Sequence, residues 1–298
     1  MENYTTDFFP DFFLIILQIF GLISYRKSRK KIFKMSDPLY IYSTILVSIL
    51  AHLRIEYCYF MKVKIDDFFT FIFVILHSVG NHAVVILEFF IILIKNPKLC
   101  SMAVEIIKLR ENLKRGESKK IITGMTTKWI FSLCFFQFFL YLHSSVVKKM
   151  SVLGDCNWFF STYNFYSLAI DILIFFYIGN VGAIFYDINN EITYVKKNND
   201  KIKHLKKILI YHREALNIVD DFNDCFGSVL LISAFKEFVV FVCTPFYGVV
   251  NPSKFLGVQE YIVWFLRYFL NYITKLLFII ITCKQVRLII YLLILLLY

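Results

Sequence analysis

Six long apolar runs constrain this chain more than any other feature of its sequence. Each run approaches or exceeds the roughly 20 residues that an α-helix needs to cross about 30 Å of hydrocarbon. Backbone amides inside a bilayer need partners within the chain, so these runs are expected to be helices. We therefore predict an all-α, polytopic transmembrane bundle. The predicted spans are Leu39–Tyr59, Phe68–Ile94, Trp129–Val147, Tyr163–Tyr186, Ser228–Val250 and Tyr261–Cys283.

Composition indicates the same class of protein. The 298 residues are 58% hydrophobic and include 34 Phe and 19 Tyr, which is more apolar surface than one water-soluble core of this size could bury. The chain contains no linker, low-complexity tract or internal repeat. We therefore predict a single transmembrane domain over residues 1–298.

Lysine and arginine are concentrated in alternate connections between the predicted spans. Three segments carry six, nine and seven basic residues, against two, two and one in the others. By the positive-inside rule, the rich segments and the N-terminus lie in the cytoplasm of a plasma-membrane protein, an orientation opposite to that of G-protein-coupled receptors. The net charge of +11 then faces the anionic inner leaflet rather than nucleic acid. The basic residues of the rich segments are Arg26, Lys27, Arg29, Lys30, Lys31 and Lys34; Lys95, Lys98, Lys108, Arg110, Lys114, Arg115, Lys119, Lys120 and Lys128; and Lys196, Lys197, Lys201, Lys203, Lys206, Lys207 and Arg213.

The apolar segment 8–24 precedes the first predicted span. It contains Pro10, Asp11 and Gln18, and basic residues follow it rather than precede it, unlike in a signal peptide. We predict a re-entrant or interfacial helix here, with a seventh crossing as the alternative.

Two helices are predicted on the cytoplasmic side. Between residues 196 and 226, apolar residues recur at spacings of three, four and seven opposite a basic face, and the chain continues into the next span without a break. A second stripe lies within 96–127, and that helix either lies along the membrane surface or docks against the 196–226 helix. The first stripe is Ile202, Leu205, Ile208, Leu209, Leu216, Val219 and Phe226, and the second is Leu99, Ala103, Ile106, Leu109 and Leu113.

Enzyme signatures are absent from the sequence. It contains no GxSxG, Walker-type loop, HExxH or CxxC, and its seven cysteines have no metal-ligand spacing. We therefore expect neither an enzyme nor a bound cofactor or metal.

Ionisable residues inside predicted spans are costly and are therefore candidates for function. Asp171 and Arg267 lie at similar depth and could pair, and Lys236 shares the fifth span with Glu237. Glu88, like Lys275, is predicted nearer the cytoplasm. These groups either hold helices together or line a water-filled path.

Aromatic and polar residues in the outer halves of several spans predict a pocket for a small molecule. Such pockets combine apolar walls with a few polar anchors. The candidate ligand-binding residues are His77, Asn81, His143, Tyr163, Asn164, Tyr166, Asp171 and Arg267.

The start of the fifth span resembles the insect gustatory receptor family, within the wider insect chemoreceptor group. The matching residues are His212, Leu216, Asn223, Phe226, Gly227, Leu230, Leu231 and Tyr247. The resemblance implies a ligand-gated cation channel that responds to small-molecule tastants, without a cofactor. It also implies a homo- or hetero-tetramer anchored below the membrane, here through the 196–226 helix.

The chain departs from this family at its C-terminal end. The Thr-Tyr and Gln-Phe motif of the family's seventh span is absent, and only eleven residues follow Arg287. We therefore expect a chain that lacks the seventh span, which puts conduction through its own pore in doubt. The alternatives are the odorant receptor branch, a non-conducting partner subunit, and a membrane transporter, which should show internal repeats.

Overall fold

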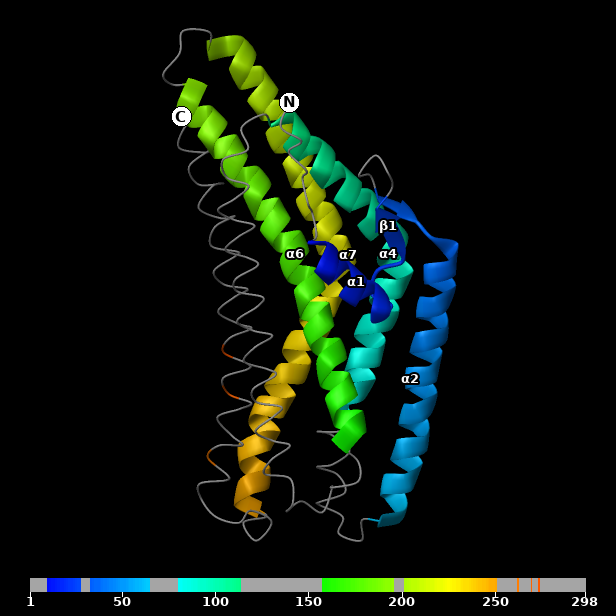
Figure 1. Ribbon diagram of the computed structural model, residues 1–298. Coiled ribbons are helices and arrows are strands. Elements are labelled where there is room, and N and C mark those ends of the chain that lie inside the picture. The colour runs from blue at the N-terminus through cyan, green and yellow to red at the C-terminus, as the bar shows by residue number, and fades with distance from the viewer. Residues whose placement is uncertain are drawn as a thin grey trace.

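The computed structural model describes residues 10–27, 33–64, 80–113, 157–195 and 201–250, together with three isolated helical residues beyond 260. Long helices lying side by side form the body of the protein, and a short N-terminal segment packs against them (Figure 1). The elements are α1 (Asp11–Ile19), β1 (Tyr25–Lys27), β2 (Phe33–Met35), α2 (Asp37–Lys64), α4 (Asn81–Asn112), α6 (Asn157–Val195) and α7 (Lys201–Val250).

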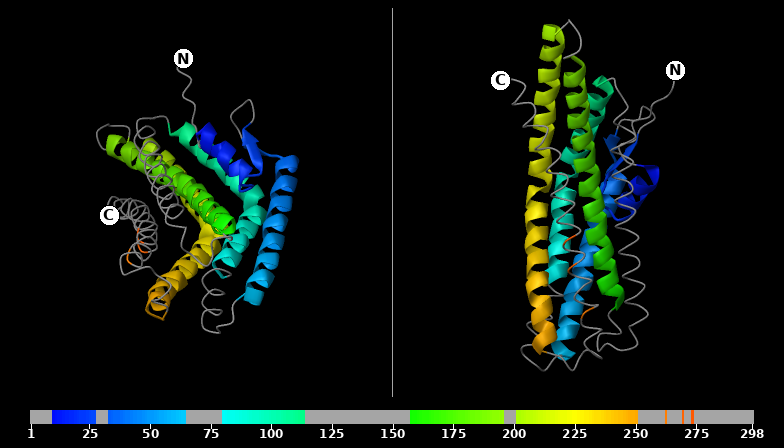
Figure 2. Two further views of the ribbon diagram at one scale, coloured as in Figure 1. Left: turned by 60° about the horizontal axis from the view of Figure 1, so that its bottom comes forward. Right: turned by 90° about the vertical axis from the view of Figure 1, so that its left-hand side faces the viewer.

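Helices α4 and α6 run in one direction through the bundle, and α2 and α7 run in the opposite direction. The upper end, as Figure 1 draws it, is where α4 and α6 end and where α7 begins, whereas α2 begins lower down, beside the β ribbon. Helices α4, α6 and α7 contact one another pairwise, and α2 packs on α4. Figure 2 shows the same bundle from its lower end and from the side.

Helix α7 confirms the predicted continuity between the amphipathic segment and the fifth span. It runs unbroken through 50 residues. At 1.5 Å per residue it is about 75 Å long, more than twice the thickness of the hydrocarbon core. Part of α7 must therefore lie outside the membrane.

The predicted apolar face of the 196–226 helix is only partly covered by the rest of the chain. Ile208 and Phe226 are buried, but Leu205, Leu209 and Leu216 are 43%, 46% and 37% exposed. The buried residues instead recur mainly at spacings of three and seven, which places them on one side of the helix, the side that α4 and α6 cover. It consists of Ile208, Ala215, Ile218, Cys225, Phe226 and Val229.

The predicted stripe of the 96–127 segment is confirmed over the described residues. Leu99, Ala103, Ile106, Leu109 and Leu113 are all at least 96% buried. This segment is the continuation of α4 rather than a separate helix. Its contacts with α7 show that it docks against that helix instead of lying apart along the membrane surface.

The N-terminal segment contains the one departure from an all-α fold among the described residues. Strands β1 and β2 form an antiparallel ribbon in which Arg26 lies opposite Lys34. Before it, the chain reverses direction at Gly21, whose φ of 69° favours glycine. A Cβ at Gly21 would also lie 3.1 Å from the Phe89 ring and 3.2 Å from the Ser43 backbone. Hydrophobic periodicity does not report so short a ribbon.

Helix α1 has nine residues and rises about 13 Å, less than the thickness of a bilayer. Its first turn lies near α6 through Phe13 and Phe176, whose ring centroids are 5.2 Å apart. At its far end, Phe20 meets the Tyr166 ring at 4.9 Å. That this segment re-enters the membrane stays a prediction.

One helix among the described residues, Phe165–Ile192, is long and apolar enough to cross a membrane. Most of its apolar window is buried inside the protein. The predicted spans 129–147 and 261–283 lie outside the described ranges, apart from single helical residues in the second. The number of crossings therefore stays a prediction.

The contacts of α6 show which segments of the other helices lie beside its upper half. Tyr177 donates a hydrogen bond to the Leu99 carbonyl, and its ring lies 5.4 Å from that of Phe226. Higher up, Phe185 packs against His212. The upper half of the predicted 163–186 span therefore lies beside segments of α4 and α7 that are predicted to lie outside the hydrocarbon.

Candidate ligand site and the junction above it

A buried group of charged side chains joins three helices in the lower part of the bundle. Lys236 of α7 is 5% exposed, and its ammonium donates a hydrogen bond to Ser167 Oγ of α6 at 3.2 Å. The same nitrogen lies 4.0 Å from Glu88 Oε1 of α4 and 3.6 Å from Glu237 Oε1. We call Glu88, Ser167, Lys236 and Glu237 the ion cluster.

Burial of the ion cluster is energetically unfavourable, because removing each charge from water costs several kcal/mol before any pairing is counted. Glu88 is 1% exposed, so water reaches this carboxylate hardly at all. Charged groups kept in such a place are candidates for function. The cluster can offer a ligand both a hydrogen-bond donor and hydrogen-bond acceptors.

Aromatic rings stand directly beside the ion cluster. Tyr166, next to Ser167 in the chain, stacks on Phe89 with centroids 5.6 Å apart. Phe89 in turn follows Glu88. Phe20, from the N-terminal segment, meets Tyr166 edge-on. The arrangement combines apolar walls with a few polar groups, which is the composition of small-molecule sites.

The structure describes only part of the predicted ligand site. Tyr166 is buried beside the ion cluster, and Asp171 is half-buried one turn further along α6. Asn81, Tyr163 and Asn164 lie on helices, but their side chains are outside the description, as are His77, His143 and Arg267 altogether. The proposed pairing of Asp171 with Arg267 is therefore untested.

Sequence reasoning found the charged members of the ion cluster, Glu88, Lys236 and Glu237, but it found neither Ser167 nor the contact between α4 and α7. Glu88 was predicted nearer the cytoplasm, and the structure brings its side chain beside Lys236. The partners are 148 residues apart in the chain, and no local pattern links them. Their shared rarity as buried charges was the one available signal.

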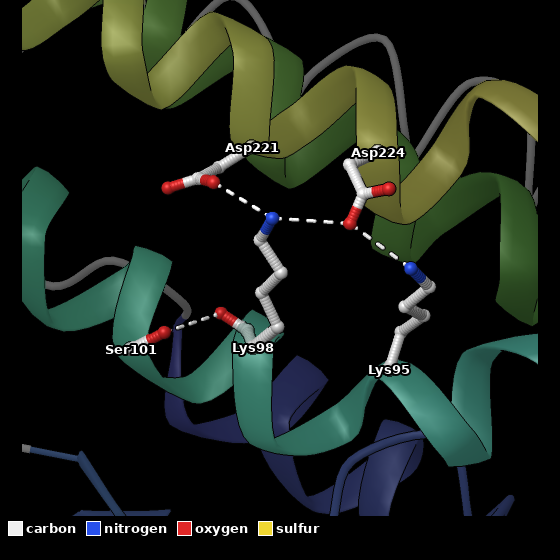
Figure 3. Close-up of polar contacts among 5 residues, drawn as sticks. All are labelled: Lys95, Lys98, Ser101, Asp221 and Asp224. Carbon is white, nitrogen blue, oxygen red and sulfur yellow. Dashed lines mark hydrogen bonds and ion pairs between the residues drawn. The ribbon is translucent and has the colours of Figure 1, made fainter.

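Above the ion cluster, exposed charges join α4 to α7 (Figure 3). Lys98 lies 2.8 Å from Asp221 Oδ1 and donates to Asp224 Oδ2 at 3.0 Å. Lys95 donates to the same Asp224 oxygen at 2.9 Å. We call these four residues the upper junction. Its side chains are between 32% and 52% exposed.

The upper junction perturbs the titration of its own members. Hydrogen bonds from Lys95 and Lys98 hold the pKa of Asp224 below its usual value. Hydrogen bonds to Asp221 and Asp224 raise the pKa of Lys98. Asp224 and Lys98 are therefore both charged at neutral pH.

Buried hydrogen bonds tie the N-terminal segment to the same part of α4. Asn96 accepts a hydrogen bond from the Ser24 amide at 2.9 Å and donates to the Leu22 carbonyl at 3.2 Å. Tyr25 and Tyr177 share a hydrogen bond of 2.6 Å between their hydroxyl groups. The region around Pro97 of α4 thus holds the N-terminal segment, α6 and α7 together.

The residues that carry the resemblance to gustatory receptors divide between two faces of α7. Phe226 is fully buried, and His212 is half-buried against Phe185, where burial lowers its pKa. Leu216, Asn223 and Leu231 are exposed. Gly227 and Leu230 lie between the faces, and the side chain of Tyr247 is outside the description.

Comparison with protein families identifies the chain. A family model described as "7tm Chemosensory receptor" matches residues 11–289, which is nearly the whole sequence. A search among curated proteins gives no match. The family consists of membrane receptors rather than enzymes, in agreement with the missing enzyme motifs. The chain belongs to the seven-transmembrane chemosensory receptor family.

Proposed function

We propose that this chemosensory receptor is a gustatory receptor and acts as a subunit of a ligand-gated cation channel that responds to small-molecule tastants. The observation that carries the proposal is the ion cluster, a set of buried charges held by three helices beside aromatic rings. The resemblance of the His212–Leu231 region to insect gustatory receptors favours taste over smell.

The ligand site is proposed around Tyr166 and the ion cluster. Asp171, Asn81, Tyr163, Asn164, His77, His143 and Arg267 remain proposed members of the same site. A tastant shifts the receptor toward its open conformation only if it binds that conformation more tightly than the closed one. Lys236 suits this role, because its ammonium can exchange Ser167 or a glutamate for a ligand acceptor.

Helix α7 offers a direct route from this site to the upper junction. Lys236 and Asp224 lie on the same unbroken helix, 12 residues or about 18 Å apart. A displacement of Lys236 would therefore move the carboxylates that hold Lys95 and Lys98. This helix is a contiguous physical link between the two sites.

The ligand response is tested by calcium imaging of cells that express the receptor. We expect responses to tastants and a loss of sensitivity of at least tenfold in Lys236→Gln, with Lys206→Gln as the matched control because Lys206 is exposed. A Lys236→Gln receptor that reaches the surface and keeps its full sensitivity would contradict the proposed site. Responses to volatile odorants alone would instead assign the odorant branch.

We further propose that α7 joins subunits into a tetramer in the plasma membrane, with the upper end in the cytoplasm. Leu205, Leu209 and Leu216 support this, because they form an exposed apolar face at spacings of four and seven. Leu205→Glu with Leu209→Glu should disperse the oligomer seen by crosslinking. Lys206→Glu with Asn217→Glu is the control on exposed polar positions of the same helix. An unchanged oligomer in the first variant would exclude α7 as the subunit contact.

A further inference from the structure

We infer that the N-terminal segment is a binding site for an anionic lipid, with α1 seated among acyl chains and the β1–β2 ribbon holding the headgroup. Two independent features of this segment lead to the inference. One is the exposed apolar face of α1, and the other is an exposed pair of like charges on the ribbon.

The apolar face belongs to a helix that is apolar on both sides. Phe13, Leu14 and Leu17 face the bundle and are buried. On the other side, Phe12, Ile15 and Ile19 are 62%, 55% and 60% exposed at spacings of three and four. A helix in water would place polar side chains on this face.

Lipid is the occupant that the surroundings indicate. The Tyr42 hydroxyl of α2 donates a hydrogen bond to the Ile19 carbonyl at 2.6 Å, so the two helices adjoin. From there the exposed face continues along α2 through Ile41, Ile45 and Ile49. A continuous apolar surface of this kind on a membrane receptor faces acyl chains.

The ribbon carries two neighbouring positive charges that a bound anion would stabilise. Arg26 and Lys34 are exposed and lie directly opposite each other in the antiparallel register. Like charges in this arrangement destabilise a ribbon. Lys27 has a carboxylate partner in Asp11 at 3.3 Å, but no ion pair joins Arg26 or Lys34 to another residue in the described part of the chain.

A lipid phosphate satisfies both features at once. Guanidinium and ammonium groups bind phosphate oxygens with charge-assisted hydrogen bonds, and Arg does so with two donors. The headgroup would lie at the ribbon while its acyl chains follow the exposed faces of α1 and α2. Because Tyr25 of β1 is hydrogen-bonded to Tyr177 of α6, the bound lipid would also steady the core of the bundle.

The test measures binding of short-chain phosphatidylserine to the purified receptor in a neutral detergent. Arg26→Gln with Lys34→Gln should weaken binding about fivefold for each charge removed. Lys206→Gln with Arg213→Gln removes the same charge from exposed positions of α7 and should leave binding unchanged. Equal weakening in both variants would show a general charge effect and overturn the site. Inorganic phosphate that displaces the lipid at similar concentration would overturn the lipid assignment.

A second measurement tests the apolar face without changing any charge. Phe12→Trp in bilayers of brominated phosphatidylcholine should lose fluorescence beyond the quenching of the three native tryptophans. Leu205→Trp, on the upper part of α7, should not. Quenching at residue 205 but not at residue 12 would overturn the placement of α1 in lipid.

Discussion

The upper junction and the ion cluster both join α4 to α7 through lysines and carboxylates, yet they differ in burial. At the junction the nitrogen–oxygen distances are 2.8–3.0 Å and water reaches every side chain. In the ion cluster the side chains of Lys236 and Glu88 are 4% and 1% exposed, and Lys236 Nζ lies 4.0 Å from Glu88 Oε1. Exposed ion pairs contribute little to stability, but a buried charge that loses its partner is strongly destabilising. Removing one partner should therefore cost little stability at the upper junction and much more in the ion cluster.

The largest expected effect comes from breaking the ion cluster. Lys236→Met leaves the buried Glu88 carboxylate without this ammonium and should lower the free energy of unfolding by about 3 kcal/mol. Thermal unfolding of the purified receptor in detergent measures it. Adding Glu88→Gln to Lys236→Met should recover part of the loss, because the buried negative charge is gone. If the double variant is less stable than the single one, desolvation does not dominate the cluster.

A neutral contact between the two regions should give an intermediate effect. Tyr177→Phe removes the hydroxyl that serves both Tyr25 and the Leu99 carbonyl, leaving two buried polar groups to find other partners. The expected loss is about 1–3 kcal/mol. Phe185→Leu, a change of apolar packing higher on α6, is the reference for a change without polar loss. Stability equal to wild type in Tyr177→Phe would mean that water replaces the hydroxyl.

The upper junction should show the smallest effect and the greatest sensitivity to salt. Lys98→Gln with Asp221→Asn, measured as a double-mutant cycle, isolates the coupling between the two side chains. We expect a small favourable coupling at low ionic strength that disappears near 1 M salt, where the screening length is about 3 Å. Coupling that persists at high salt would show that the junction is less exposed than the structure indicates.

Acid should remove the contribution of the upper junction. The folded pKa of Asp224 lies below its ordinary value of 3.8, so its ion pairs stabilise the fold above that value and are lost as pH falls through the folded pKa. The raised pKa of Lys98 means that its contribution is lost only in strong alkali. The difference in stability between wild type and Asp224→Asn should thus stay constant from about pH 5 to about pH 9. A difference that changes within this range, below about pH 6.5, would instead indicate a histidine such as His212, whose pKa burial lowers.

Patterns along the chain predicted the helices themselves better than they predicted which neighbours cover each helix. The periodicity of Leu99, Ala103, Ile106 and Leu109 predicted a buried stripe, and the unbroken run through Gly227 predicted one long helix into the fifth span. Both are confirmed, because helical periodicity reports which residues share a face. It does not report which part of an apolar face the rest of the chain covers, and so Leu205 and Leu209 share the predicted stripe with Ile208 although only Ile208 is buried.

The candidate site shows the same limit. Tyr166 was recognised as a candidate, but the meeting of Lys236 with Glu88 and Ser167 depends on how three helices are aligned, which separate stretches of sequence do not encode in any local pattern. The ribbon of β1 and β2 was missed because strands of three residues give too few positions for an alternating pattern.

The sequence by itself determined that this chain is a helical membrane receptor, because composition, run length and family pattern are properties of the chain alone. The tertiary structure decided what covers each apolar surface. The Phe165–Ile192 part of α6 is long and apolar enough to cross a membrane, yet most of its apolar window is buried inside the protein, and α4 and α7 cover it around Tyr177 and Phe185. Hydropathy measures only the free energy of leaving water, which is similar whether lipid or another helix takes the place of water. Only the packing of the bundle shows whether lipid or another helix covers a given apolar surface.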